Sequence, residues 1–309
     1  MEASLRWVAI TAVAPIAWGS NYYVTREFLP ADSPLYGALL RALPAGLVLL
    51  AACRRLPSGS WWWRSLVLGT LNVGAFFVLI YLAAQLLPTS VASTVMATSP
   101  VVMMLFAWLL LAAPPRSRHL AGAALGIAGV ALMLFTGAVA TDVRGVLASV
   151  AAMTMSSLGY VLTKKWSTDL RADVGVLSLT SWQLVAGGLV LLPVAVAVEG
   201  APPTLDGPAV LGFLYVAVVA TALAFAAWFG GLRHLDAGTV GLVGLLNPVT
   251  GVLLGTVVAG EVLSLRQLCG LALVLAGIAL GRPVRARPGP AAVSPVSPGA
   301  TGGRAGPAA

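Results

Sequence analysis

Residues 65–115 decide the fold class because they carry no charged side chain. They read SLVLGTLNVGAFFVLIYLAAQLLPTSVASTVMATSPVVMMLFAWLLLAAPP. A helix needs about 20 predominantly apolar residues to cross the hydrocarbon core of a bilayer, so this stretch is too long for one span. Leu87-Pro88-Thr89-Ser90 breaks the apolar run. The stretch therefore predicts two membrane-spanning helices, over 65–86 and 89–112.

The composition of the whole chain agrees with this prediction. Of its 309 residues, 59% are hydrophobic and only 9% are charged, whereas soluble domains have about 25% charged residues. This excludes a soluble enzyme, a disordered protein and a disulfide-rich secreted module. The net charge of +8 does not indicate nucleic-acid binding, because the cations lie between apolar runs. Cys53 and Cys269 lie far apart in apolar stretches, which is typical of small buried hydrophobes rather than a disulfide or a metal site.

Backbone polar groups have no partners in lipid, so each span must be a complete helix. Applied to the whole chain, this rule predicts an all-α polytopic membrane protein with ten transmembrane helices. The first repeat, 1–141, contains spans at 7–26, 34–53, 65–86, 89–112 and 119–139. The second repeat, 142–281, contains spans at 145–165, 174–198, 209–232, 237–259 and 265–281. Residues 282–309 are rich in proline and glycine, which predicts a disordered cytoplasmic tail.

The distribution of Lys and Arg predicts the orientation. If the chain starts inside, 14 of its 18 Lys and Arg residues lie in cytoplasmic segments and three, Arg26, Arg144 and Arg266, lie outside. This bias follows the positive-inside rule and predicts that both termini are cytoplasmic. Arg41 is the remaining cation and lies inside a span. The tryptophans at 61–63 beside Arg64 are typical of an interfacial aromatic belt.

The two halves of the sequence resemble each other. A shift of 148 places Pro100 on Pro248 and Gly122 on Gly270, and it aligns residues 128–132 with 276–280. Smaller shifts place Ser20 on Ser157 and Arg41 on Gln183, as loop insertions would produce. Each repeat has five spans, and because five is odd the second repeat must enter the membrane from the opposite face. The pattern predicts two inverted repeats, which is a common architecture of alternating-access carriers.

These residues resemble the EamA branch of the drug/metabolite transporter superfamily. The resemblance is carried by Trp18-Gly19-Ser20-Asn21, by Leu40-Arg41, and by the stretch from Asn247-Pro248 through Gly260-Glu261 to Ala276-Gly277. It covers residues 7–281. It implies a ten-helix transporter of small organic solutes, commonly an exporter of amino acids or other metabolites. The sequence departs from the family pattern at Ala113, where the fourth span often ends in an acidic residue.

Arg41 has two interpretations, which the sequence leaves open. A central arginine in a span costs about 2.5–3.5 kcal/mol on insertion scales, so its side chain should face protein or water. It could bind a substrate carboxylate or phosphate, or form a gating ion pair. Alternatively, it could anchor helix packing through backbone carbonyls or extend toward the outer interface.

The other candidate site residues are polar or aromatic side chains within predicted spans, and proline hinges. Aromatic side chains with a polar end suit the wall of an adaptable cavity, although an outer-interface belt explains those of the first span equally well. Mid-span prolines free a carbonyl group and kink a helix, so we expect Pro100 and Pro248 to be hinges. The expected substrate-binding residues are Trp18, Asn21, Tyr22, Arg41, Asn72, Ser99, Ser157, Tyr160, Gln183, Trp228 and Asn247.

The leading functional hypothesis is a secondary transporter that exports a small amphipathic solute such as an amino acid. The chain contains no phosphate-binding loop for ATP, and its two histidines and scattered carboxylates do not form a catalytic or metal-binding constellation. We therefore expect no enzyme activity, cofactor, metal or nucleic-acid partner. The expected protein is a monomer or homodimer in the plasma membrane of a bacterium. The alternative is a channel or receptor-like membrane protein, although a channel needs a wetter, more polar pore.

Overall fold

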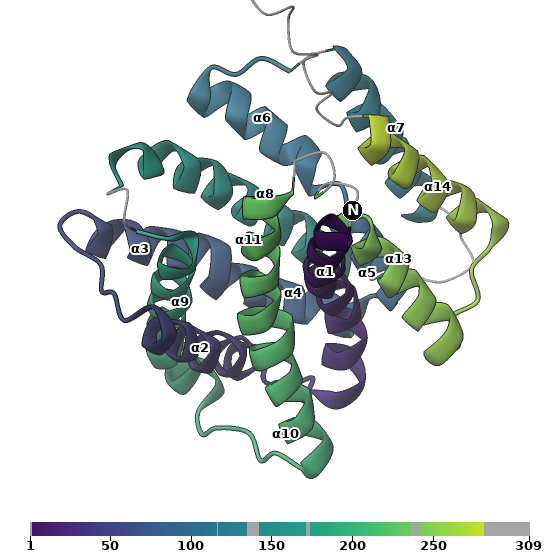
Figure 1. The fold of residues 1–309 in the computed structure, drawn as a ribbon. Helices are drawn as coiled ribbons and strands as arrows, with labels where there is room; N and C mark the ends of the chain where they lie inside the picture. Colours follow the sequence, from purple (N-terminus) through teal and green to yellow (C-terminus); the bar gives the residue numbers. More distant parts are fainter. Residues whose placement is uncertain are drawn as a thin grey trace, which may run out of the picture.

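The computed structural model describes residues 2–115, 117–134, 142–170, 174–235, 240 and 243–280. Throughout these ranges the chain forms helices joined by turns and loops, without a β-strand, which confirms the all-α fold class (Figure 1). The expected tail at 282–309, the end of the span at 119–139 and the first residues of the span at 237–259 lie outside the described residues.

The helices follow the predicted order of spans. In the first half they are α1 (Glu2–Phe28), α2 (Pro34–Cys53), α3 (Trp61–Gly69), the π-helix η1 (Thr70–Gly74), α4 (Ala75–Leu86), α5 (Thr89–Met96), α6 (Ser99–Leu111) and α7 (Ser117–Leu134). In the second half they are α8 (Val143–Trp166), the 3₁₀ turn η2 (Ser167–Asp169), α9 (Val176–Glu199), α10 (Gly207–Leu214), the π-helix η3 (Tyr215–Leu223), α11 (Ala224–His234), α13 (Leu246–Leu253), the π-helix η4 (Leu254–Val258) and α14 (Leu265–Leu280).

Six helical stretches in the described residues are long and apolar enough to cross a membrane. They are Pro34–Cys53, Trp61–Leu86, Thr89–Leu111, Val143–Trp166, Val176–Glu199 and Gly207–Leu232. The fifth, ninth and tenth predicted spans correspond to shorter apolar helices, Ser117–Met133, Leu246–Val258 and Leu265–Leu280. α1 is 27 residues long, but its Trp-Gly-Ser-Asn-Tyr-Tyr stretch lowers its hydropathy. The chain is thus a multi-pass membrane protein with six clear apolar spans.

Polar side chains, mostly carboxylates, cap the helices that begin at one end of the bundle, which we call the capped end. Two of them come from distant segments. Glu199, the last residue of α9, accepts hydrogen bonds from the backbone N–H groups of Leu35 (2.7 Å) and Tyr36 (2.9 Å) at the start of α2. Glu261 accepts them from Thr89 (2.6 Å) and Ser90 (3.1 Å) at the start of α5. These bonds satisfy amides that have no partner within the helix.

Local residues cap the other three helices that begin at the capped end. Asp142 accepts from the backbone of Arg144 at the start of α8, and Asp206 accepts from Ala209 in α10. Hydrogen bonds from Arg144 hold the pKa of the Asp142 carboxyl below its usual value. At the start of α14, Gln267 and Ser264 bond each other's backbone N–H groups, the reciprocal pattern of a capping box.

Tryptophans gather at the opposite end, which we call the tryptophan end. The Trp182 indole of α9 donates to the carbonyl oxygen of Arg55, just after α2 (2.7 Å). The Trp63 ring meets the Trp166 ring at the end of α8 with centroids 5.1 Å apart. Trp62 is 60% exposed, whereas Trp61 is 5% exposed. The belt predicted from residues 61–63 therefore combines outward-facing indoles with one that packs inside.

Two helix pairs, each with one member from either half of the chain, pack along their lengths. α2 packs against α9, and α7 packs against α14, as Figure 1 shows at the upper right. Glycines permit the close approach of α7 and α14. A Cβ atom added at Gly129 would lie 2.5 Å from the carbonyl oxygen of Gly270, and one added at Gly277 would lie 2.5 Å from that of Gly122. This small-residue packing is typical of helices in membranes.

Several spans are interrupted in the middle. The π-helix η1 separates α3 from α4, and η3 separates α10 from α11. The fourth span turns at Ala97-Thr98, and the chain turns again at Gly244-Leu245 just before α13. Pro100 lies in the first turn of α6, so a break between two helices replaces the continuous kinked helix expected there. Irregular backbone at this depth is tolerated where it is enclosed by protein or lines a cavity.

Candidate functional site

Arg41 lies inside α2 and is 9% exposed. Its Nε donates a hydrogen bond to Oγ1 of Thr221 in η3 (3.1 Å), and its guanidinium carbon lies 4.0 Å from the centroid of the Phe77 ring in α4. The phenols of Tyr22 and Tyr160 are within electrostatic range. The terminal nitrogens of Arg41 bond no residue that the structure describes, and no described carboxylate pairs with it. Within the described part of the chain, a largely buried cation thus has hydrogen-bond donors without a partner.

A small cavity of about 10 Å³ borders Arg41. We call it the Arg41 cavity. Its lining comes from the end of α1, from α2, from α4 and from η3: Thr25, Leu29, Gly37, Ala38, Arg41, Phe77, Ile80, Tyr81 and Val216. A volume of this size holds about one water molecule. The cavity would therefore have to widen before it could take a solute.

Asn72 and Gln183 form a second buried polar contact between the halves. Nδ2 of Asn72 in η1 donates to Oε1 of Gln183 in α9 (2.7 Å). Both residues are at least nine-tenths buried, and Oδ1 of Asn72 accepts no hydrogen bond from a described residue. Gly159 of α8 makes room for this side chain, because a Cβ atom there would lie 1.9 Å from Oδ1 of Asn72. The contact depends on a glycine that hydropathy does not single out.

Both polar contacts involve π-helices. Thr221 lies in η3 and Asn72 lies in η1. The wider π-turn shifts the backbone hydrogen bonds by one residue and occurs frequently at functional sites. Oγ1 of Thr221 also donates to the carbonyl oxygen of Val216, five residues earlier (2.7 Å). The π-turns aim polar side chains at Arg41 and Gln183.

The candidate residues of α1 divide between two surfaces. The Trp18 ring meets the rings of Trp228 (5.4 Å between centroids) and Phe225 (5.6 Å) in α11. Tyr22 instead packs among apolar residues of α4 and α5 and near Arg41. Asn21 is 3% exposed, and its Oδ1 accepts no hydrogen bond from a described residue. The two aromatic side chains that a helical wheel places on one face therefore contact different helices.

The remaining candidates lie at the helix breaks. Oγ of Ser157 in α8 donates to the carbonyl oxygen of Ser99 (3.3 Å). The carbonyl oxygen of Asn247 would lie 2.4 Å from a Cβ atom added at Gly19 of α1. Pro248 is buried, whereas Pro100 is exposed. Both breaks are thus packed against the first helix of the other half, α8 or α1.

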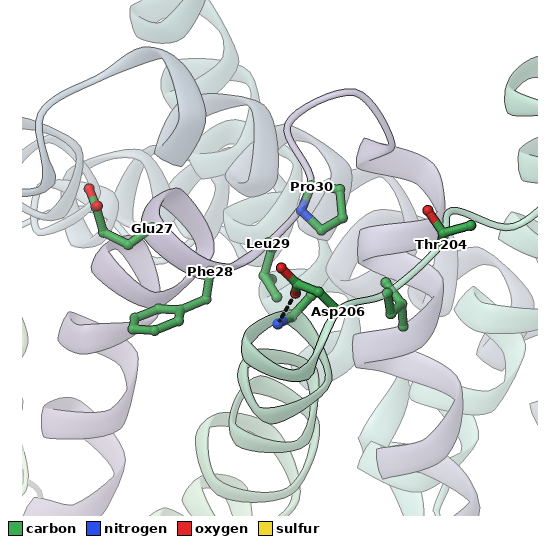
Figure 2. Close-up of a pocket in the computed structure, with 8 residues that line it drawn as sticks. Glu27, Phe28, Leu29, Pro30, Thr204 and Asp206 are labelled. Atoms are coloured by element: carbon green, nitrogen blue, oxygen red, sulfur yellow. Dashed lines mark hydrogen bonds between the residues drawn. The ribbon is translucent and has the colours of Figure 1, made fainter.

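Two larger pockets open at the capped end, and their linings share Pro30 and Thr204. The first, of about 540 Å³, is lined by Glu27, Phe28, Leu29, Pro30, Thr204, Leu205, Asp206 and Ala209. Figure 2 shows the residues after α1 facing those before α10 across it. The second, of about 640 Å³, is lined by Pro30, Asp32, Ser33, Pro34, Val198, Glu199, Ala201, Pro203 and Thr204. Four carboxylates line these pockets, which makes the capped end acidic.

Sequence reasoning did not identify Phe77, Gly159 or Leu29 as part of this region. Phe77 and Gly159 lie inside apolar stretches, where nothing distinguishes them from packing residues. Leu29 lies in the short segment between the first two predicted spans, where no motif marks it. For a metal, the described residues contain no group of three His, Cys, Asp or Glu side chains that could hold one.

Comparisons with known proteins agree on a single family. The model of the EamA-like transporter family matches residues 5–135 and again 143–281. Protein PecM from Dickeya dadantii is 38% identical over 265 residues, which cover 86% of this chain and 88% of PecM. The inner membrane transporter YedA of Escherichia coli K12, itself uncharacterized, is 26% identical and covers 86% and 87% of the two chains.

Two further comparisons extend this agreement. A probable amino-acid metabolite efflux pump from Salmonella typhimurium is 28% identical over 278 residues, covering 85% of this chain and 90% of the pump. One crystal structure superposes with a TM-score of 0.61 at 20% identity, covering 89% of this chain and 96% of that one. That likeness concerns the fold alone.

Proposed function

Because the chain belongs to the EamA-like transporter family, we propose that it is a secondary transporter that exports a small organic solute by alternating access. Its apolar helices make it a multi-pass membrane protein, and several of its relatives are named as transporters. The amino-acid metabolite named for one relative supports a small amphipathic solute with a carboxylate. We place the protein in the plasma membrane of a bacterium, with both termini in the cytoplasm.

The single observation that carries the proposal is the matched packing of the two halves. The 148-residue shift relates Gly122 to Gly270 and Gly129 to Gly277. Exchanging the halves therefore turns the contact of Gly122 with Gly277 into the contact of Gly270 with Gly129, and both contacts are present. The pairing of α4 with α8 likewise has its counterpart in that of α11 with α1. This supports ten spans arranged as two inverted repeats.

The same exchange relates the two buried polar contacts. Arg41 corresponds to Gln183, and each bonds a residue of the π-helix in the third span of the opposite half, Thr221 or Asn72. Alternating access requires that each half adopt in turn the arrangement of the other. Hydrogen bonds that cross between the halves can exchange partners or solvent as the halves rock, and the breaks at Pro100 and Pro248 would act as hinges.

We assign Arg41 to the anionic group of the solute. The charge is taken out of water, it has no described carboxylate partner, and Arg41 lines a cavity. A guanidinium is well suited to bind a carboxylate through two parallel hydrogen bonds. Tyr22 and Tyr160 would flank this group, and Trp18, Asn21, Asn72, Ser99, Ser157, Gln183, Trp228 and Asn247 remain the proposed wall of the widened cavity.

Purified protein in liposomes tests the proposal. We expect exchange of labelled aromatic amino acids or similar amphipathic carboxylates without ATP, and we expect Arg41→Ala to reduce the exchange rate at least about tenfold, since a desolvated charge-assisted hydrogen bond contributes about 1.5–3 kcal/mol. Arg266→Ala, which removes an exposed cation, is the control and should exchange normally. Normal exchange by Arg41→Ala would make Arg41 a packing residue. Single-channel currents from the purified protein would show that it is a channel and not a carrier.

A further inference from the structure

One side chain separates the Arg41 cavity from the capped end. Leu29 is the residue that lines both the first capped-end pocket and the Arg41 cavity. It is 6% exposed and directly follows α1. Figure 2 shows it between Pro30 and the start of α10, at the inner side of the pocket. The two spaces therefore adjoin at this apolar residue.

The backbone around Leu29 is held by side chains of α4. Nε2 of Gln85 donates to the carbonyl oxygens of Thr25 (2.8 Å) and Leu29 (3.1 Å). The Tyr81 hydroxyl donates to the carbonyl oxygen of Pro30 (2.6 Å). These bonds satisfy carbonyls at the end of α1 that have no partner within the helix. The segment that carries Leu29 is thus fixed to the first half of the chain.

The side chain of Leu29 packs with Tyr81 of the first half and also against the second half. It lies in a cluster with Phe213 and Val216, and a Cβ atom added at Gly212 would lie 2.8 Å from its Cδ2 atom. The missing side chain at Gly212 creates the space that Leu29 fills. If α10 and η3 moved away from α1 and α4, Leu29 would lose its contacts with Phe213 and Val216. It would then stay with the first half, and the passage between the two spaces would open.

We propose that Leu29 is an apolar plug and that the solute passes from Arg41 through the Arg41 cavity, past Leu29, to the pockets at the capped end. This inference rests on the proposed transport function and names its route. An apolar constriction excludes water when closed, which keeps the terminal nitrogens of Arg41 dry and available to an anionic group. Beyond the plug, Glu27, Asp32, Glu199 and Asp206 line the pockets, so an anionic solute released there would be repelled from returning.

Thiol accessibility tests the plug without requiring transport. Thr25 lines the Arg41 cavity and is 3% exposed, so Thr25→Cys places a near-isosteric reporter behind Leu29. The background carries Cys53→Ala and Cys269→Ala, which remove the native thiols. A membrane-impermeant methanethiosulfonate is added to one side of sealed vesicles at a time. We expect Leu29→Ala to increase the labelling rate of Thr25→Cys about tenfold or more from the side of the α1–α2 loop only, because truncating a buried leucine opens a cavity.

Leu87→Ala provides the matched control. Leu87 is likewise a buried leucine near the capped end, but it lines neither of the two spaces, so the same truncation should leave the labelling rate of Thr25→Cys unchanged. Leu29→Val should give a smaller increase in the same direction and keeps the proposal testable if the alanine variant does not fold. Unchanged labelling in folded Leu29→Ala or Leu29→Val, or equal labelling in Leu87→Ala, would overturn the plug.

Transport by the same variants separates the plug from the function. Faster labelling together with no solute exchange by the parent protein would keep the plug and reject the transporter. Solute exchange by the parent together with unchanged labelling in Leu29→Ala would keep the transporter and reject this route.

Discussion

A buried arginine loses the favourable free energy of its hydration, and contacts within the protein must compensate for this loss. Insertion scales put the cost of a central arginine at about 2.5–3.5 kcal/mol. One hydrogen bond to Thr221 and one aromatic ring at 4.0 Å offset part of this cost, because such contacts contribute about 0.5–3 kcal/mol each. A helix-packing anchor would use its terminal nitrogens on carbonyl groups. Those of Arg41 have no partner among the described residues, and Arg41 lines a cavity, which favours a role in binding.

The Asn72–Gln183 contact gives a second prediction for a single residue. Gly159→Ala would place a Cβ atom 1.9 Å from Oδ1 of Asn72, so the Asn72 side chain must turn away and the bond to Gln183 is lost. We expect a loss of stability of about 1–3 kcal/mol, as for other overpacked sites, together with slower solute exchange. Thermal unfolding in detergent measures the first effect and liposome exchange the second.

Gly207→Ala is the control for this prediction. No atom lies within 4 Å of a Cβ atom built there, so its unfolding temperature and exchange rate should match those of the parent protein. If Gly159→Ala also matched the parent in both measurements, the prediction would be wrong. The Asn72 side chain would then tolerate the added methyl group, and its contact with Gln183 would not matter for transport.

The sequence predicts which residues are unusual more readily than what they touch. Arg41 and Gln183 stand out because polar groups are rare in apolar spans. Their partners depend on the packing of α2 against η3 and of α9 against η1, and on the π-turns in the third span of each half, which no local pattern encodes. Trp18 and Tyr22 illustrate the same limit, since one helical face meets α11 at one level and α4 and α5 at another.

At the scale of the helices, the acidic residues have a structural role. The sequence places Glu199 and Glu261 just beyond the ends of predicted spans. The structure shows that each carboxylate binds two backbone N–H groups at the start of a helix in the other half. The positive end of the helix dipole adds to this stabilisation. These two caps fasten the halves to each other at the capped end.

Substitutions of Glu261 measure the strength of one cap. We expect Glu261→Ala to lower the free energy of unfolding by about 0.5–2 kcal/mol, the range for N-cap substitutions. Glu261→Gln should lose less, because its amide oxygen can still accept one hydrogen bond. The control is Glu27→Gln, which removes an exposed carboxylate whose Oε1 lies 3.9 Å from Nε of Arg26. Because exposed ion pairs contribute little to stability, this substitution should hardly change the free energy of unfolding. Equal losses in all three variants, measured by thermal unfolding, would show that Glu261 is not a cap.

Helix positions follow from hydropathy because lipid demands long apolar segments, and the predicted boundaries fall close to those of α2 and α9. The interruptions do not follow from it. η1, η3 and the turn at Ala97-Thr98 change which backbone groups are paired, and neighbouring helices decide whether a freed carbonyl finds a partner. Pro100 predicts a disturbance near that turn without predicting whether the helix bends or breaks.

At the scale of the whole molecule, the two ends of the bundle differ in chemistry. The starts of α2, α5, α8, α10 and α14 are at the capped end, whereas α1 begins beside His234 at the end of α11, where the rings of Trp7 and His234 stack 3.7 Å apart. α1 and α8, the first helices of the two halves, therefore begin at opposite ends. Internal sequence similarity and an odd number of spans predict this arrangement, because five crossings return the chain to the other face.

Four single cysteines test this arrangement in the membrane. In the background without native cysteines, Leu5→Cys at the start of α1 and Leu56→Cys after α2 should react with an impermeant thiol reagent from one side. Val143→Cys at the start of α8 and Val262→Cys before α14 should react from the other side. All four positions are highly exposed, from 65% to 91%, so the side of addition limits their reaction. The positive-inside rule assigns the first pair to the cytoplasm. Reaction of Leu5→Cys and Val143→Cys from the same side would contradict the inversion, and the exchange of conformations between halves on which alternating access rests would then have no structural basis.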